Sequence, residues 1–193
     1  MAHRYAELMF TPAVERVQEQ RGSRAGNARR KTAPGVSNER LGPEEAAFVA
    51  ARDNFYMATA STLGQPYIQH RGGPIGFVKV FGQRWLGFPD YRGNRQYISV
   101  GNLAENNRCA LIFVDYASRR RLKLVGRAHI IEASDSAFVA RLADPAYAAK
   151  LERAILITID AYDWNCPQHI TPRFTEAEAR VRFAPETHIA MEG

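Results

Sequence analysis

Apolar positions in the middle of the chain follow the two-residue period of β-strands. One run places Leu122, Leu124 and Ile130 on one face and charged side chains on the other. The run ALIFVDY is continuously apolar, as in a strand covered on both faces. Turn residues such as Gly, Pro, Asn and Asp separate these runs. The expected strands are 55–60, 67–72, 75–81, 84–88, 110–116, 122–130 and 154–164.

Helical signals are confined to the periphery of this strand-rich region. Pro43, followed by two acidic residues, predicts a helix start, and this helix should end near Asp53. Other helical segments are expected at 4–20 (interrupted by Pro12), 94–106, 135–152 (broken at 144–145) and 175–181. Six or more strands with short connections predict a mainly β (α+β) fold, a small barrel rather than a parallel α/β sheet.

Length and composition favour one barrel domain with an N-terminal addition. A chain of 193 residues with 46% hydrophobic content can bury one sizeable core. We assign residues 1–40 to a helical segment and basic arm, and residues 41–193 to the barrel. No apolar run approaches the ~20 residues of a membrane span, and no secretory pattern begins the chain. Cys109 lies in an apolar run and is expected to be a buried free thiol. A free thiol indicates a reducing compartment, so a cytoplasmic protein is expected.

The net charge of +6 raises the question of nucleic acid. Much of the basic excess falls within residues 16–40, where we expect a loop at 21–40 that behaves as a mobile, solvated arm. The alternative is a contact arm for a partner subunit or a polyanion. No strand-borne aromatic pair of the RNA-recognition type accompanies the arm, which disfavours a nucleic-acid module.

The segment GNRQYISVGNLAENN at 93–107 carries a polar stripe. Arg95, Ser99, Asn102 and Asn106 are spaced i, i+4, i+7 and i+11, which places them on one helix face. Asn94 is a cap-type residue, so backbone N–H groups, a cation and amide donors should converge. That combination suits a phosphate, and a nucleotide cofactor is the first hypothesis.

A second segment, DWNCPQHITPR at 163–173, forms a polar and rigid turn after an apolar strand. Trp164 directly follows the apolar strand, so one interpretation of it is a tryptophan that packs in the core. Cys166 lacks a second cysteine nearby that would support a redox role. His70, His129 and His169 lack the spacing of metal ligands, so no metal site is expected.

Together these segments resemble the flavin-binding split barrel of the pyridoxamine 5'-phosphate oxidase family. The resemblance rests on the hairpin and strand GQPYIQHRGGPIGFVKV and on FPDYRGNRQYISVGNLAENN. The DWNCPQHITPR segment is similar to a subgroup described as predicted flavin-nucleotide-binding proteins. The similarity covers roughly residues 43–175.

The resemblance implies a six-stranded antiparallel split β-barrel with peripheral helices. It also implies a homodimer with two FMN molecules between the subunits. The candidates for binding the phosphate are Asn94, Arg95 and Ser99. Arg71 is a fourth candidate, from the strand side of the site; the alternative is that Arg71 is simply a charged residue on an edge strand. Gln69 and His70 are expected to contact the ribityl chain or the ring. Asn102 is a weaker candidate for cofactor binding, because it lies further from the phosphate. The turn with Trp164, Asn165 and Gln168 is expected to reach the ring across the dimer interface.

The resulting prediction is an FMN-dependent oxidoreductase of unknown substrate, reduced by NAD(P)H or a partner reductase. Flavin itself performs the redox chemistry, so no catalytic residue is named. The alternatives are a pyridoxamine or pyridoxine 5'-phosphate oxidase, a non-catalytic flavin carrier or sensor, and a barrel that binds haem or a deazaflavin. The chain end ARVRFAPETHIAMEG shows no clear equivalent of that oxidase's arginine–histidine element, which argues against the vitamin B6 reaction.

Overall fold

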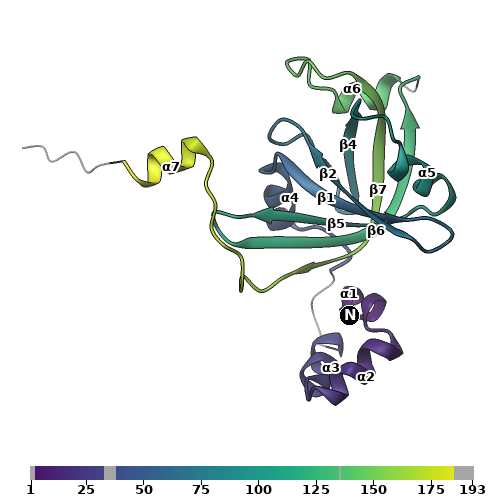
Figure 1. The fold of residues 1–193 in the computed structure, drawn as a ribbon, viewed down its shortest axis with the longest axis vertical. Helices are drawn as coiled ribbons and strands as arrows, with labels where there is room; N and C mark the ends of the chain where they lie inside the picture. The colour runs from purple at the N-terminus through teal and green to yellow at the C-terminus, as the bar shows by residue number, and fades with distance from the viewer. Residues whose placement is uncertain (1–2, 33–37, 135, 185–193) are drawn as a thin grey trace, which may run out of the picture.

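Seven antiparallel strands form one curled sheet in this computed structural model, which describes residues 3–32, 38–134 and 136–184. The strand order is β2-β1-β5-β6-β7-β4-β3 (Figure 1). The split-barrel prediction is confirmed, with seven strands rather than six. The strands are β1 Asn54–Ala60, β2 Pro66–Gly72, β3 Lys79–Phe81, β4 Trp85–Tyr91, β5 Arg108–Asp115, β6 Arg120–Glu132 and β7 Leu151–Trp164.

The helices lie around the sheet. Three of them, α1 to α3, form an N-terminal unit beside β6 and β7, and α7 stands away from the barrel (Figure 1). Among the helices that the structure describes, none is long and apolar enough to cross a membrane. The helices are α1 Arg4–Met9, α2 Pro12–Gln20, α3 Arg24–Thr32, α4 Pro43–Ala50, α5 Ile98–Glu105, α6 Ser136–Leu142 and α7 Glu176–Arg182.

An aromatic cluster fills the barrel. The Phe55 side chain is fully buried, and its ring lies 4.9 Å from that of Phe113 and 5.0 Å from that of Phe88. Strict alternation of buried and half-buried residues along β1 places Phe55 and Met57 on this inner face. Cys109 is buried as predicted.

Two expected elements are shorter than the pattern indicates. The strand expected at 75–81 is reduced to β3, because Gly76 takes a φ of +76° and a turn joins Phe77 N–H to the Pro74 carbonyl. The helix expected at 135–152 stops at Leu142, and residues 151 and 152 already belong to β7.

The expected loop at 21–40 is wrong, because residues 24–32 form helix α3. Glu15 of α2 pairs with Arg24 at 3.0 Å and with Lys31 at 3.1 Å. Pro12 begins α2 at its first position, where a missing N–H costs nothing. The basic segment is therefore folded onto α2 rather than a free arm.

Candidate functional site

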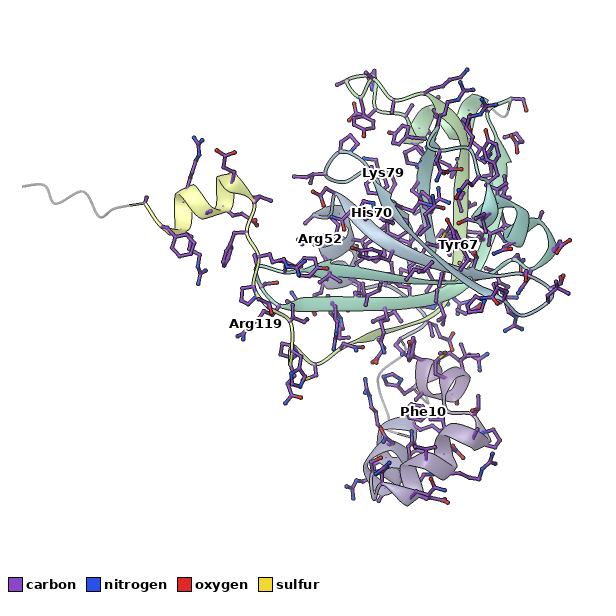
Figure 2. All side chains as sticks on the ribbon, viewed as in Figure 1. Phe10, Arg52, Tyr67, His70, Lys79 and Arg119 are labelled. Atoms are coloured by element: carbon purple, nitrogen blue, oxygen red, sulfur yellow. The ribbon has the colours of Figure 1, made fainter. Side chains whose placement is uncertain are left out.

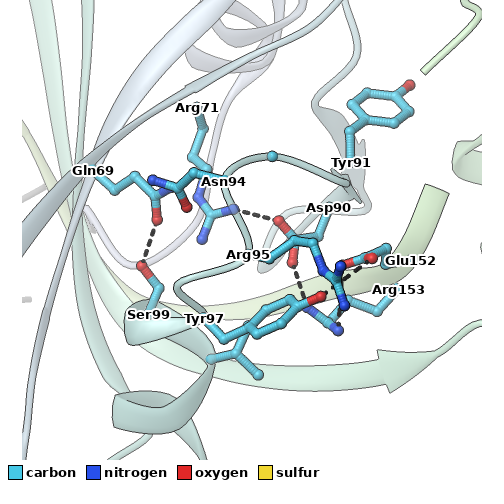
Figure 3. A pocket seen from close by; sticks show the side chains of 12 residues that line it. Gln69, Arg71, Asp90, Tyr91, Asn94, Arg95, Tyr97, Ser99, Glu152 and Arg153 are labelled. Carbon is cyan, nitrogen blue, oxygen red and sulfur yellow. Dashed lines mark hydrogen bonds and ion pairs between the residues drawn. The ribbon is translucent and has the colours of Figure 1, made fainter. Parts of the chain in front are cut away.

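A small polar cavity of about 50 Å³ lies where β2, β4, β7 and the start of α5 meet (Figure 3). Five of the ten predicted site residues line it. The cavity is lined by Gln69, Arg71, Asp90, Tyr91, Gly93, Asn94, Arg95, Tyr97, Ser99, Val100, Glu152 and Arg153.

Asp90 is the most buried charge in this cavity, with 5% of its surface exposed. One carboxylate oxygen accepts a hydrogen bond from Arg71 Nη1, and the other accepts one from Arg153 Nη1 at 3.1 Å (Figure 3). The three residues come from β2, β4 and β7. In the strand order, β2 and β3 are the sheet edges in the described part of the chain. The Arg71–Asp90 pair therefore joins β2 to β4, two strands that are not neighbours in the sheet.

The start of α5 differs from the prediction. The helix begins at Ile98, its N-cap is Tyr97, and both Tyr97 and Arg95 have a left-handed φ, of 53° and 63°. Arg95 thus lies in the loop before the helix. Asn94 is not the helix cap; its Oδ1 accepts a hydrogen bond from Gln96 N–H at 3.1 Å. The strained loop still places Asn94 and Arg95 at the cavity, together with the first turn of α5.

The predicted polar face of α5 exists from Ser99 onward, and it joins the helix to the sheet. Ser99 Oγ donates to Gln69 Oε1 at 3.0 Å, next to the cavity. Asn102 Nδ2 donates to Thr59 Oγ1 at 3.1 Å, and Asn106 Nδ2 donates to the carbonyl oxygen of residue 60 at 3.2 Å. Only Ser99 of these three lines the cavity, so Asn102 is a structural contact within this chain.

Glu152 closes the other side of the cavity. Arg92 Nε donates to it at 2.8 Å and Tyr97 Oη at 3.3 Å. The hydrogen bond from Arg92, and then that from Tyr97, hold the pKa of Glu152 below its usual value. The Tyr97 hydroxyl also raises the pKa of Arg95, whose side chain is exposed and keeps its charge.

Strand alternation separates His70 from its neighbours. Gln69 pairs with Met57 and Arg71 with Phe55, so both side chains lie on the inner face of the sheet. His70 pairs with Tyr56 on the outer face, where their rings lie 5.5 Å apart (Figure 2). His70 therefore does not face the cavity.

Trp164, Asn165 and Gln168 lie at the far end of β7. Trp164 Nε1 donates to the buried Glu45 at 2.8 Å, and its ring packs edge-on against Phe48 at 4.8 Å. Asn165 N–H donates to the Arg121 carbonyl, and Gln168 is exposed. Eleven residues separate Arg153 from Trp164 along the strand, a span of roughly 35 Å. One small ligand cannot touch both ends of β7 in a single subunit.

The donors at the cavity fit an anion. Arg71 Nε and Arg153 Nε are buried and have no hydrogen-bond partner among the described residues. Orphaned donors of this kind are rare and call for an explanation. The N-terminal amides of α5 add a positive dipole end. A phosphate group matches this donor set in charge, and the cavity volume suits a group of that size rather than a ring system.

Sequence reasoning missed seven of the twelve residues that line the cavity. Asp90, Arg153 and Glu152 lie on strands, and they reach the site only through the sheet. One signal was available: Asp90 is a charge within the apolar run WLGFPDY, and such a charge is kept only when it is paired. In the described ranges, no group of three or more His, Cys, Asp or Glu side chains could hold a metal ion.

Comparisons with known proteins identify the family and the fold. The family model described as Pyridoxamine 5'-phosphate oxidase matches residues 41–164. HupZ of Group A Streptococcus is similar in structure, with a TM-score of 0.52 and 16% identity over 69% of this chain and 99% of its own. A candidate pyridoxamine 5'-phosphate oxidase from Lactobacillus delbrueckii gives a TM-score of 0.51 and 16% identity. The match covers 66% of this chain and 97% of that protein. No curated protein sequence matches the chain.

Proposed function

Because this chain belongs to the pyridoxamine 5'-phosphate oxidase family, we propose that it is an FMN-binding flavoprotein and an FMN-dependent oxidoreductase. The observation that carries the proposal is the cavity at the start of α5, where Arg71 Nε is buried without a partner among the described residues. In this proposal the cavity holds the terminal phosphate of FMN.

The phosphate end of FMN accounts for the residue types at the cavity. Arg71 offers a fork of N–H donors, and Arg95 adds a second, exposed cation. The first amides of α5 donate along the helix axis. In this proposal Gln69, whose Oε1 accepts a hydrogen bond from Ser99, contacts the ribityl chain.

The isoalloxazine ring lies outside this cavity, which has room for a phosphate alone. In this proposal the ring lies between two subunits, as the resemblance to the family implies. The outer face of β1, β2 and β5 supports that arrangement, because Ile68 is 64% exposed there and a hollow of about 420 Å³ is lined by Ala58, Ala110 and their neighbours. In the proposed homodimer, the second subunit contributes the turn that carries Trp164, Asn165 and Gln168 to the ring.

Bound FMN supplies hydride and electron transfer. The residues of the chain hold its phosphate and orient its ring, and NAD(P)H or a partner reductase donates the electrons. Residues 185–193, most of the chain end that we searched for an arginine–histidine element, lie outside the described residues.

The test is a titration of the purified protein with FMN and with riboflavin, followed by light scattering of the complex. We expect a dimer that binds FMN at least about tenfold more tightly than riboflavin, because several charge-assisted hydrogen bonds depend on the phosphate. Anaerobic NADPH or NADH then serves to find the electron donor. A protein that binds neither flavin contradicts the proposal, and equal affinities contradict the phosphate site.

A further inference from the structure

We propose that Asp90 is a positioning residue, which holds Arg71 and Arg153 in the orientation that binds the cofactor phosphate. This inference rests on the proposed function. It assigns a purpose to a buried carboxylate in a site that otherwise suits an anion.

The position of Asp90 in the sheet is the first argument. It lies directly opposite Arg153 in the β4–β7 ladder, and the register of that ladder shifts between Asp90 and Tyr91. Such irregularities re-aim the side chains beside them. Its other partner, Arg71, reaches it from edge strand β2, across a seam without a backbone ladder in the described part of the chain. A single carboxylate thereby fixes the two arginines relative to each other.

The hydrogen-bond geometry is the second argument. Each oxygen of Asp90 accepts from one terminal Nη atom, while the Nε atoms of both arginines are buried without a partner in the residues described. The Arg153 Nε lies 3.9 Å from Glu132 Oε1, beyond hydrogen-bond distance. Asp90 therefore uses part of each guanidinium and leaves other donors available to a ligand.

The charges around the two arginines differ. Arg153 also lies 3.7 Å from Glu152, and its guanidinium sits 5.2 Å from the ring centre of Tyr97. Among the described residues, Arg71 has Asp90 as its single ion-pair partner. Its side chain is only 12% exposed, so Asp90 is the group that sets its direction. The ion pair with Asp90 restricts the rotamers of this arginine before the ligand arrives.

Positioning and simple charge make opposite predictions for the loss of this carboxylate. A negative charge next to a phosphate repels it, so charge alone predicts that Asp90→Asn binds FMN more tightly. If Asp90 positions the arginines, the same change frees two mutually repelling guanidinium groups and weakens the binding of FMN. Riboflavin, which lacks the phosphate, should be little affected.

The experiment compares FMN and riboflavin affinities of the wild type, Asp90→Asn, Asp90→Glu and Glu39→Gln. Glu39 is the charge control, since it pairs with the exposed Arg84 and lines neither the cavity nor the hollow proposed for the ring. We expect Asp90→Asn to lose roughly tenfold or more in FMN affinity with less than about a threefold change for riboflavin. Asp90→Glu should recover part of the loss, and Glu39→Gln should match the wild type.

An FMN affinity of Asp90→Asn equal to or tighter than that of the wild type overturns the inference. A wild type that binds no flavin overturns the proposed function instead, so the two failures are distinguishable. Should Asp90→Asn fail to fold, Arg71→Lys answers the same question, because lysine keeps the charge but not the oriented fork. We expect it to lose FMN affinity about tenfold, and an unchanged affinity overturns the inference.

Discussion

Gln69, His70 and Arg71 are consecutive residues with different environments. Strand pairing turns Gln69 and Arg71 inward, opposite Met57 and Phe55. The same pairing turns His70 outward, opposite Tyr56. The face of the sheet on which a side chain lies, more than its residue type, determines whether it can reach the cavity. Of these three residues, only Gln69 and Arg71 face the proposed phosphate site.

The two cysteines provide a direct test of burial. Burial raises the pKa of the Cys109 thiol from 9.0 to about 12, and Cys166 is exposed. At pH 8 we expect a thiol reagent to modify one cysteine in the folded chain and two in denaturant, since only the thiolate reacts. Cys166→Ser should abolish the reaction of the folded protein. Modification of Cys109 in the folded protein would contradict the structure.

The same thiol makes stability depend on pH. Above pH 9, Cys109 ionises in the unfolded chain but stays protonated in the folded one, so the unfolded state binds fewer protons. The free energy of unfolding should therefore fall between pH 9 and 12, by at most about 1.4 kcal/mol per pH unit from this group alone. Cys109→Ala should lack this contribution when urea unfolding is followed across that range.

Trp164 holds the start of α4 against the barrel. Trp164→Phe keeps the ring contact with Phe48 but removes one of the hydrogen-bond donors to the Glu45 carboxylate. The carboxylate still accepts a hydrogen bond from Gly42 N–H at 2.9 Å. We expect the free energy of unfolding to fall by about 1–3 kcal/mol, measured by urea denaturation. Trp85→Phe is the control, because Trp85 is 39% exposed. An unchanged stability for Trp164→Phe would argue against this role.

At the element scale, α5 has two functional halves. Its first turn borders the cavity, and its later turns bind the sheet through Asn102 and Asn106. Replacing Arg95 by Ala should weaken FMN about tenfold and leave riboflavin nearly unchanged. Replacing Asn102 and Asn106 by Ala should cost about 2 kcal/mol of stability without changing the ratio of the two affinities. Equal losses of both ligands in the first variant would exclude the phosphate assignment.

Elements with a strong local signal were predictable from the sequence, and those that depend on distant partners were not. The strands β1, β2, β5, β6 and β7 show clear apolar patterns. Helix α3 does not, because its Gly, Asn and clustered arginines favour a loop, and it depends on Glu15 of α2 and on Asp163 of β7. The start of α5 was misplaced because two non-glycine residues adopt a left-handed φ, which no local preference indicates.

At the scale of the whole molecule, the N-terminal unit is attached to the barrel through Asp163. This carboxylate is 9% exposed and faces Arg30 of α3, Lys123 of β6 at 3.6 Å and His3 at 3.6 Å. The sequence analysis assigned His3 and Arg30 to a separate N-terminal segment, because their common partner lies more than 130 residues away. The candidate site shows the same limit: Arg71 was predictable by type, but its pairing with Asp90 depends on how the sheet curls.

Asp163→Asn should therefore loosen the N-terminal unit. We expect faster amide hydrogen exchange in α1 and α3 and a loss of about 1–3 kcal/mol in unfolding free energy, since the buried partner of several cations is removed. Asp160→Asn is the matched control, because its pair with the exposed Arg127 contributes at most about 1 kcal/mol. Unchanged exchange in Asp163→Asn would show that apolar contacts alone attach the unit.

The most direct test of the account is an ultraviolet–visible spectrum of the purified protein after incubation with FMN and desalting. The account predicts retained yellow colour, with the two flavin bands at close to one FMN per chain. It also predicts that riboflavin, treated in the same way, is lost on desalting. A colourless protein after incubation with FMN would contradict the central claim, and the cavity at Arg71 and Asp90 would then belong to another anion.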